Sequence, residues 1–191
     1  MLDVLIIGAG PAGNRAASLL ASLGRSVLVL DQSERIGDKL CSGIVSKECV
    51  DRYNVPSKLV YRDVKSSWIF PPRCEGLFVQ RPEVQACVID RVGFVRELAT
   101  RAQAQGASYL LKRRVVHLRR SSTGVLAAVR YRGALEEYEA KAVIVATGFA
   151  SSVGRNLGLE PPRKVAFAAQ TTLIDVVADD LQVYAGRWVP Q

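Results

Sequence analysis

The stretch Asp3-Val4-Leu5-Ile6-Ile7-Gly8-Ala9-Gly10-Pro11-Ala12-Gly13 decides how this 191-residue chain folds. Residues 3–7 are a short apolar run without alternation, which is typical of a parallel strand buried on both faces. The three glycines that follow have separate roles: Gly8 allows a tight turn, Gly10 lets the backbone approach a pyrophosphate, and Gly13 lets the next helix pack close to the strand. The pattern predicts a dinucleotide-binding turn, the alternative being a structural glycine-rich turn in another α/β protein.

The helix after this turn is expected to begin at Pro11, because the N–H that proline lacks would have no partner at the first helical position. Apolar residues that recur with a helical period predict its buried stripe: Ala12, Ala16, Leu19, Leu20 and Leu23. Gly24 is expected just after its C-terminus. A second buried strand follows at residues 27–30 and ends in Asp31, whose carboxylate can accept hydrogen bonds from both ribose hydroxyls of an adenosine.

A polar, glycine-containing loop covers residues 32–45, after the second strand. Ligands of open α/β sheets bind outside the carboxyl ends of the strands, so this loop is a candidate part of a cofactor site. Gln32, Arg35 and Lys39 are expected near phosphate or ribose, and Cys41-Ser42-Gly43 near a ring system. A solvated loop without a ligand is the alternative.

The domain organisation is read from a change of pattern. Residues 59–80 contain short strands broken by Pro71-Pro72, which predicts β structure inserted between two Rossmann-like halves. The fold class is therefore α/β, with a Rossmann-like domain and an inserted, incomplete β-rich domain. The cofactor domain is assigned to residues 1–58 and 90–160, and the partial substrate domain to residues 59–89 and 161–191.

A helix over residues 90–106 is expected, with Asp90 as its N-cap and Gly106 at its end. Arg91 is its informative residue, because a cation in the first turn opposes the helix dipole at a cost of about 0.3–1 kcal/mol. A cofactor phosphate nearby would explain this arginine. An arginine whose stem only covers apolar surface is the alternative.

The rest of the chain is expected to contain strands and short helices. The expected helices are at 46–53 and 151–157, and the expected strands are at 107–111, 115–118, 125–131, 135–138, 141–148, 164–175 and 181–189. The strand at 141–148 ends in Ala146-Thr147-Gly148, which returns the chain to the cofactor side of the sheet. His117, the single histidine, lies in an expected strand and is interpreted as structural.

Composition narrows the class of protein. The four cysteines have no metal-ligand spacing, so no metal site is predicted and reduced thiols are expected. The net charge of +8 is interpreted as a solvated basic surface, or as attraction to anionic substrates or lipid headgroups, and no nucleic-acid motif is present. No apolar run would cross a bilayer and no basic segment precedes the first strand. A cytoplasmic protein, or one at the membrane surface, with a true N-terminus is expected.

Five segments taken together resemble one family. The order and spacing of residues 8–13, Asp31, Lys39-Leu40-Cys41-Ser42-Gly43, residues 91–98 and Ala146-Thr147-Gly148 resemble the FAD-dependent geranylgeranyl reductases, a family of the para-hydroxybenzoate hydroxylase-like flavoproteins. The resemblance extends over essentially the whole chain. The Lys-x-Cys-x-Gly loop and the Arg-x-x-Phe-x-x-x-Leu helix are its more specific parts.

The resemblance implies FAD as cofactor and a set of residues around it. Gly8, Gly10 and Gly13 would hold the pyrophosphate with Pro11 and Ala12 at the helix start, and Asp31 would hold the ribose with Gln32, Arg35 and Lys39 beside it. Arg91 would reach the phosphate or ribityl region, Val115 would offer its backbone to the adenine, and Cys41, Ser42 and Gly43 would adjoin the isoalloxazine. Ala146, Thr147 and Gly148 complete the implied site.

The implied activity is the reduction of C=C bonds in a prenyl or other apolar substrate by hydride from flavin N5, with NAD(P)H or ferredoxin as electron donor. No side chain is assigned as a catalytic acid or base. A third FAD motif containing Gly-Asp is expected beyond residue 191, so the chain is interpreted as a fragment. The alternatives are an aromatic hydroxylase, monooxygenase or halogenase of the same superfamily, and a non-catalytic FAD-binding module.

Overall fold

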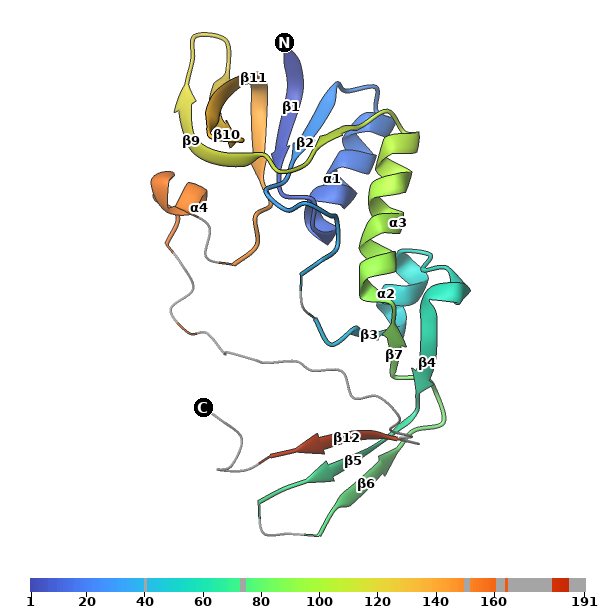
Figure 1. The fold of residues 1–191 in the computed structure, drawn as a ribbon. Helices are drawn as coiled ribbons and strands as arrows, with labels where there is room; N and C mark the ends of the chain where they lie inside the picture. The colour runs from blue at the N-terminus through green and yellow to red at the C-terminus, as the bar shows by residue number, and fades with distance from the viewer. Residues whose placement is uncertain (40, 73–74, 150–151, 161–163, 165–179, 186–191) are drawn as a thin grey trace. The chain divides into compact units, whose positions relative to one another are not determined.

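Figure 1 shows the computed structural model, which describes residues 1–39, 41–72, 75–149, 152–160, 164 and 180–185. The chain divides into two compact units: the first consists of Met1–Lys39 and Val95–Lys164, and the second of Leu40–Phe94 and Val165–Gln191. The predicted domains differ from these units mainly in residues 40–58 and 90–94, which the sequence assigns to the cofactor domain. The cofactor and substrate roles of the two units stay predictions.

The first unit is built on one six-stranded sheet (Figure 1). In spatial order its strands are β8 (Ser108–Leu110), β2 (Val27–Leu30), β1 (Leu2–Ile7), β11 (Ala134–Val145), β10 (Val125–Tyr131) and β9 (Arg114–Arg120). β1 pairs in parallel with β2 and β11, and β2 pairs in parallel with β8. β10 is antiparallel to both of its neighbours. The predicted α/β class with a Rossmann-like parallel sheet is confirmed.

The strand β11 differs from the prediction, which divided it into strands at 135–138 and 141–148. One continuous strand of 12 residues is present instead. Its first part pairs with β10 up to Ala140, and its second part pairs with β1 from Ala140 onward. No glycine or proline interrupts residues 134–145, so the chain stays extended while its hydrogen-bonding partner changes.

Two hydrophobic clusters cover the two faces of β1 and β2. The strand residues of one cluster are Val4, Ile6, Val27 and Val29, and those of the other are Leu5, Ile7, Leu28 and Leu30. This alternation follows from the period of two in a strand. Helical residues such as Ala17 and Ala102 join the first cluster, whereas Val115 and Ala127 of the antiparallel strands join the second. The parallel strands are thus buried on both faces.

The helix α1 (Pro11–Ser22) begins at the predicted proline, but its buried face matches the predicted one only in part. Its buried residues are Gly13, Asn14, Ala17 and Ala21, whereas Leu19 and Leu23 are 47% and 72% exposed. The close approach at Gly13 turns the small residues of the helix toward the sheet. Of the predicted stripe, Ala16 and Leu20 are partly buried against the cluster. After Leu23, Gly24 ends the helix with a φ of +74°, as predicted.

The helix α3 (Arg91–Ala104) agrees with its prediction at both ends. The carboxylate of Asp90 accepts a hydrogen bond of 2.8 Å from the Gly93 N–H, and Gly106 follows the helix with a φ of +103°. The expected pair of Glu97 and Arg101 is present, with 2.9 Å between Oε1 and Nε. Two other short helices, α2 (Lys47–Arg52) and α4 (Ser152–Asn156), lie where they were expected.

The second unit contains two three-stranded sheets. The strands of the first are β3 (Ile44–Ser46), β7 (Ala86–Ile89) and β4 (Val60–Val64), and those of the second are β12 (Leu181–Tyr184), β5 (Ser66–Phe70) and β6 (Leu77–Gln80). A 3-10 turn at Ser57–Leu59 precedes β4. The expected β-rich character is present. The strand expected at 164–175 and the end of the one expected at 181–189 lie outside the described residues.

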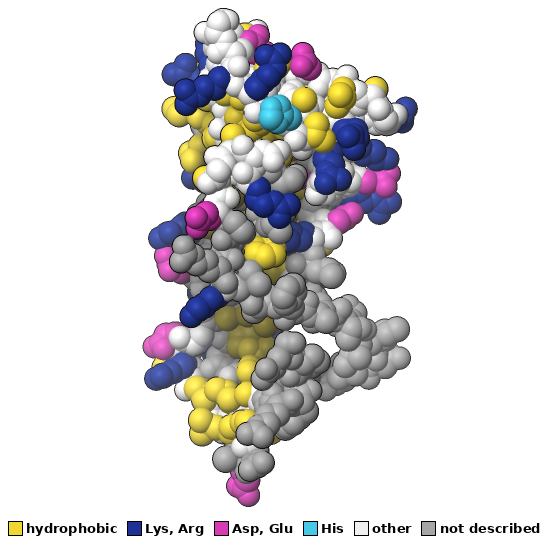
Figure 2. Space-filling model, turned by 90° about the vertical axis from the view of Figure 1, so that its left-hand side faces the viewer, with side chains coloured by type: hydrophobic (Ala, Val, Ile, Leu, Met, Phe, Trp, Pro, Cys, Tyr) yellow, Lys and Arg dark blue, Asp and Glu magenta, His cyan; other side chains and the backbone are white. Residues whose placement is uncertain are grey.

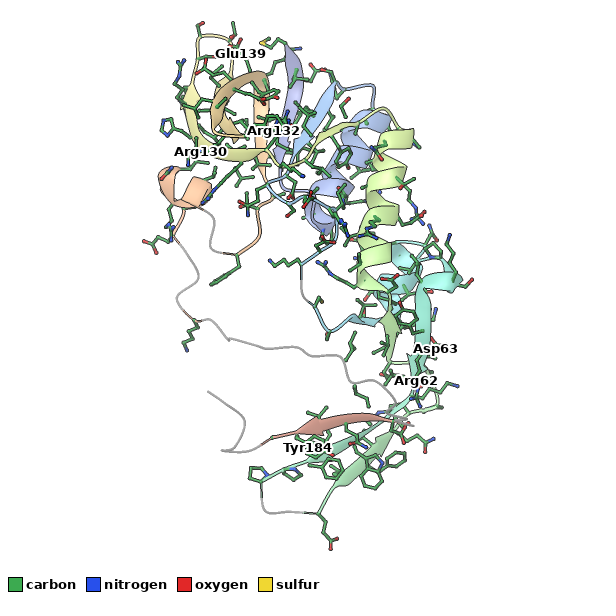
Figure 3. The ribbon with its side chains drawn as sticks, viewed as in Figure 1. Arg62, Asp63, Arg130, Arg132, Glu139 and Tyr184 are labelled. Atoms are coloured by element: carbon green, nitrogen blue, oxygen red, sulfur yellow. The ribbon has the colours of Figure 1, made fainter. Side chains whose placement is uncertain are left out.

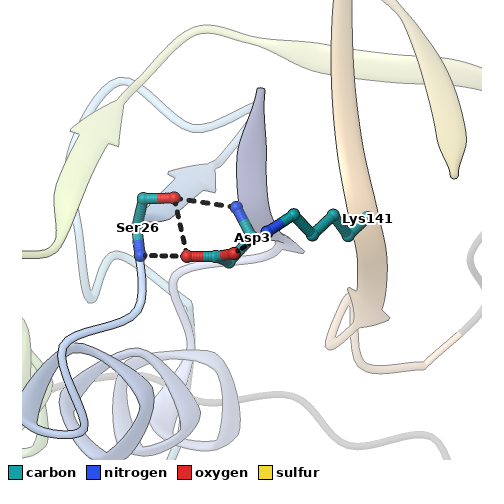
Figure 4. Close-up of polar contacts among 3 residues, drawn as sticks. All are labelled: Asp3, Ser26 and Lys141. Carbon is teal, nitrogen blue, oxygen red and sulfur yellow. Dashed lines mark hydrogen bonds and ion pairs between the residues drawn. The ribbon is translucent and has the colours of Figure 1, made fainter. Parts of the chain in front are cut away.

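Asp3 of β1 joins Ser26, just before β2, to Lys141 within β11, as Figure 4 shows. Its carboxylate accepts hydrogen bonds from the Ser26 N–H (2.9 Å), the Ser26 hydroxyl (3.1 Å) and the Lys141 ammonium (2.6 Å). Lys141 first, and then Ser26, hold the pKa of this carboxyl well below its usual range. A lowered pKa in the folded state means that the stabilisation is complete above the unfolded pKa of about 4 and is lost as the pH falls further.

We therefore expect Asp3→Asn to lower the melting temperature at pH 7. The difference from the wild type should shrink as the pH falls below about 4, because the wild-type carboxylate is then being protonated as the chain unfolds. Thermal unfolding followed by circular dichroism, from pH 7 to below about pH 4, measures the melting temperatures of both proteins and the difference between them. Glu48→Gln, which removes an exposed pair with Arg52, is the control and should change little at any pH. If the melting temperature of Asp3→Asn differs from that of the wild type by the same amount at all pH values, the ionised Asp3 carboxylate is not the source of the stabilisation.

Candidate cofactor site

The glycine turn at the end of β1 lies against the end of β11. The Gly8 N–H donates to the Leu30 carbonyl at 2.8 Å, and the Ala146 N–H donates to the Ile7 carbonyl at 2.8 Å. Gly8 has a φ of +110°, and a Cβ on it would lie 2.4 Å from the Ala146 carbonyl oxygen. Both observations restrict this position to glycine. The Gly8 turn and the Ala146 end of β11 are therefore brought together.

Gly13 is required by the packing of α1. A Cβ at this position would lie 1.9 Å from the Gly8 carbonyl oxygen, much closer than real Cβ atoms approach another atom. The first turn of α1 therefore rests directly on the backbone of the glycine turn. This contact brings the N-terminus of the helix to the carboxyl end of β1.

Gly10 differs from Gly8 and Gly13, because nothing in the fold requires a glycine there. Its φ is −75°, and a Cβ on it would have no neighbour within 4 Å. It is the N-cap of α1, and the helix has neither a side-chain cap nor an acidic residue in its first turn. The first N–H groups of a helix lack intrahelical partners and attract anions. Open space at Gly10 beside such a helix end fits the pyrophosphate of FAD.

Asp31 lies at the end of β2 and is already bonded within the protein. One carboxylate oxygen accepts from the Ala9 N–H at 2.6 Å, and the other accepts from the Ser33 N–H at 2.7 Å. The side chain thus links the glycine turn to the loop after β2. A carboxylate has about four acceptor sites, so it could still accept from a ribose. The ribose contact stays a prediction.

The loop after β2 is held by an arginine that the sequence analysis did not select. Arg96 of α3 donates from Nε to the Ile36 carbonyl at 3.1 Å and pairs through Nη2 with Asp38 at 3.4 Å. Among the predicted residues of this loop, Gln32, Arg35 and Lys39 are exposed. The Lys39 ammonium lies 3.2 Å from the point where a Cβ of Gly148 would be. Lys39 is therefore a neighbour of the Thr147-Gly148 turn.

Arg113 is joined to Asp31 by a backbone hydrogen bond. Its N–H donates to the Asp31 carbonyl at 2.8 Å. Its guanidinium pairs with Glu136 at 2.9 Å and lies 3.2 Å from the centre of the Tyr131 ring. Val115, two residues further along β9, is buried at 4% exposure beside a register shift of the β9–β10 pair. Its predicted backbone contact with adenine remains a prediction.

Four predicted residues, Cys41, Ser42, Gly43 and Arg91, belong to the second unit. Gly43 has a φ of +75°, and a Cβ on it would lie 2.6 Å from the Ile89 carbonyl, so the loop is fixed to β7. Cys41 and Ser42 are exposed, and Arg91 opens α3. The expected approach of these four residues to FAD stays a prediction.

Two described cysteines of the second unit, Cys41 and Cys87, lie in different environments. Cys87 is fully buried, and its Sγ donates to Asp63 at 3.2 Å. Burial first, and the Asp63 hydrogen bond second, raise the pKa of this thiol to about 11. Cys87 therefore stays protonated near pH 7 and is not a nucleophile, whereas Cys41 is exposed. Among the described residues, no group of three His, Cys, Asp or Glu side chains could hold a metal ion.

The positive charge of the chain lies in the first unit. There 17 Lys and Arg residues outnumber 9 Asp and Glu residues, whereas the second unit has 9 of each. Figure 2 shows Lys and Arg side chains on the face that carries His117, which is exposed on β9. Exposed arginines are also present at the end of the neighbouring strand β10 and in the turn after it, where Figure 3 labels Arg130 and Arg132. A positive unit attracts an anionic cofactor.

Comparisons with known proteins show the family of the chain. The sequence matches the pyridine nucleotide-disulphide oxidoreductase family over residues 2–177. It is 36% identical to a digeranylgeranylglycerophospholipid reductase of Methanosarcina mazei, over 85% of this chain and 41% of that protein. It is 31% identical to an uncharacterized protein in the nifH2 5′ region of Methanosarcina barkeri, over 82% of this chain and 88% of that protein. The chain thus spans less than half the length of the reductase.

Solved structures show the same fold. A geranylgeranyl bacteriochlorophyll reductase-like protein of Thermoplasma acidophilum has a TM-score of 0.74 and 28% identity, over 83% of this chain and 42% of that one. A myxobacterial chondrochloren halogenase has a TM-score of 0.66 and 16% identity, over 81% of this chain and 39% of that one, and shares the fold alone. The chain belongs to the pyridine nucleotide-disulphide oxidoreductase family, among FAD-dependent oxidoreductases whose relatives include the geranylgeranyl reductases.

Proposed function

We propose that this chain is the FAD-binding part of a reductase that saturates C=C bonds of a prenyl or other apolar substrate. The observation that carries the proposal is the open space at Gly10 beside the uncapped N-terminus of α1, in a chain related to named prenyl-lipid reductases. FAD, when bound, would supply hydride from its N5 atom. The protein would bind and orient the cofactor and keep water from the reacting atoms.

The residues of the first unit would each hold a part of FAD. The N–H groups at the start of α1 would bind the pyrophosphate, and Asp31 would accept from the adenosine ribose. Lys39, beside the Thr147-Gly148 turn, would place a positive charge near the phosphate or ribose. From the second unit, Arg91 and the Cys41-Ser42-Gly43 loop would complete the site. NAD(P)H or ferredoxin would deliver the electrons.

An apolar sheet in the second unit supports an apolar substrate. Trp68 contacts Phe78 with ring centres 5.0 Å apart, and Phe70 stacks on Tyr184 at 4.6 Å. Figure 3 shows Tyr184 among these side chains. Phe78 and Tyr184 are 42% and 52% exposed, and Leu77 on the opposite face is 59% exposed. Exposed apolar patches commonly mark binding surfaces. We assign these aromatic side chains to the substrate region.

Contact with a membrane surface belongs to this proposal, because a prenyl lipid resides there. The support is the excess of basic residues in the first unit, which anionic headgroups would attract. In the part of the chain that the structure describes, no helix is long and apolar enough to span a bilayer.

The first experiment is the absorbance spectrum of the purified chain, desalted after incubation with FAD. A retained flavin band supports the proposed cofactor. Dithionite-reduced, anaerobic protein is then mixed with a geranylgeranyl lipid. We expect the flavin to reoxidise while the lipid gains hydrogen atoms, as measured by mass spectrometry. Turnover that requires oxygen and yields a hydroxylated product would instead support a monooxygenase. A folded chain that retains no flavin would contradict the proposal.

A matched pair of variants tests the substrate region. Phe78→Ala, in the exposed aromatic sheet of the second unit, should slow the reoxidation by the lipid without loss of bound flavin. Leu135→Ala removes a side chain that is 66% exposed in the first unit, and it should change neither quantity. Equal effects of the two variants would reject the aromatic sheet as the substrate region.

A further inference from the structure

The buried polar side chain of Asn14 connects three segments of the first unit. Its Nδ2 donates to the Ala9 carbonyl at 3.0 Å and to the Val95 carbonyl at 3.1 Å. Its Oδ1 accepts from the Tyr109 hydroxyl at 2.9 Å. Asn14 is fully buried, and it is the one buried polar or charged side chain in the described part of the chain. The amide therefore joins the glycine turn to α3 and to β8.

The hydrogen-bond partners of Asn14 determine how its amide is oriented. Burial raises the pKa of Tyr109 to about 12, so this hydroxyl keeps its proton and remains a donor near pH 7. The Ala9 and Val95 carbonyls can only accept, so they require the Nδ2, which leaves the Oδ1 facing the Tyr109 hydroxyl as its acceptor. The hydrogen bond from Tyr109 to Oδ1 thus stabilises the orientation in which Nδ2 is bonded to the Ala9 carbonyl.

The bond from Asn14 to Ala9 determines where the next N–H points. The peptide between Ala9 and Gly10 is trans, so its C=O and its N–H point in opposite directions. The Ala9 carbonyl is held by Asn14, and the Ala9 N–H is held by Asp31. With both sides of Ala9 fixed, the Gly10 N–H points away from Asn14. Open space lies next to Gly10, where a Cβ would meet no atom within 4 Å.

We propose that Asn14 is a positioning residue of the dinucleotide site, which acts through the Ala9–Gly10 peptide to direct the Gly10 N–H at the pyrophosphate. This inference rests on the proposed binding of FAD. Asn14 would not touch the cofactor itself. It would strengthen the binding of the phosphates and leave the binding of the adenosine unchanged. The distinction between phosphate and adenosine makes the role measurable.

The test compares ADP with adenosine as competitors of FAD on the whole chain. The dissociation constant of adenosine divided by that of ADP measures what the phosphates contribute to binding. Asn14→Leu keeps nearly the same side-chain size but removes the amide. We expect it to lower this ratio about tenfold while the dissociation constant of adenosine stays nearly constant, since a misdirected N–H affects only the phosphates. Tyr109→Phe should lower the ratio by a smaller factor.

Val129→Ala is the matched control, because it removes buried volume from the other cluster of the same unit without touching the glycine turn. It should lower the melting temperature and leave the ratio unchanged. An unchanged ratio in Asn14→Leu overturns the inference, and if that variant does not fold, an unchanged ratio in Tyr109→Phe does so. A wild-type chain that binds neither FAD nor ADP overturns the proposed function itself. If the wild type binds FAD and ADP but the ratio is the same in Asn14→Leu as in the wild type, only this inference is overturned.

Discussion

Gly13→Ala is expected to unfold the first unit or to destabilise it by about 4 kcal/mol or more, the range reserved for the most damaging single substitutions. The added methyl group would lie 1.9 Å from the Gly8 carbonyl oxygen. That oxygen belongs to backbone whose own N–H is bonded to Leu30, so it cannot move aside without breaking the turn. The helix α1 would have to separate from the sheet. Urea or thermal unfolding followed by circular dichroism measures the loss, and flavin retention should disappear with it.

Gly10→Ala is the matched control for this substitution. The same methyl group would meet no atom of the protein, and the φ of −75° suits alanine. Alanine is a poorer N-cap than glycine, so a loss of up to about 1 kcal/mol is expected. The affinity for FAD should fall about tenfold or more, because the methyl group would occupy the space of the pyrophosphate. A Gly10→Ala chain that binds FAD normally would place the pyrophosphate elsewhere.

Asp31→Asn is expected to weaken FAD binding more than tenfold and to destabilise the chain by about 1.5–3 kcal/mol, the usual contribution of a hydrogen bond to a charged group. Each oxygen of the wild-type carboxylate accepts a backbone N–H, one from Ala9 and one from Ser33. An asparagine would place its NH₂ against one of these donors and would offer the ribose one acceptor fewer. Equilibrium unfolding and flavin titration measure the two effects separately.

Asp38→Asn is the control for Asp31→Asn, because it makes the same chemical change in the same loop. Asp38 pairs with Arg96 at 3.4 Å, and both side chains are about half exposed. Exposed ion pairs contribute about 0–1 kcal/mol, so little change in stability or FAD affinity is expected. Similar losses in both variants would mean that the loop as a whole, rather than the Asp31 carboxylate, supports the cofactor.

Local signals in the sequence were sufficient for the elements whose ends are set by neighbouring residues. The N-cap at Asp90, the left-handed Gly106 and the pair of Glu97 and Arg101 involve residues a few positions apart, and each is present. The strand β11 was divided in the prediction because its pattern changes at Ala140. That change reflects a new strand partner and no break in the chain, and the identity of a partner is not a local property.

The buried face of α1 also depends on a contact that is not local in the sequence. Hydrophobicity selects Leu19 and Leu23, yet the contact at Gly13 brings the backbone of the helix so close to the sheet that Ala17 and Ala21 are buried instead. Large side chains do not fit into so narrow a gap. The short distance between α1 and the sheet, rather than the hydrophobic periodicity of α1, thus determines which of its residues are buried.

The sequence by itself determined the glycine turn, the helix that follows it and the acid at the end of β2, because glycine stereochemistry and capping act between near neighbours. Only the tertiary structure decided that Asp31 bonds to Ala9, that Arg96 holds the loop at Ile36, and that Asn14 contacts Val95 and Tyr109. These contacts join residues 22 to 95 positions apart. Their existence depends on how strands and helices pack, which no short stretch of sequence specifies.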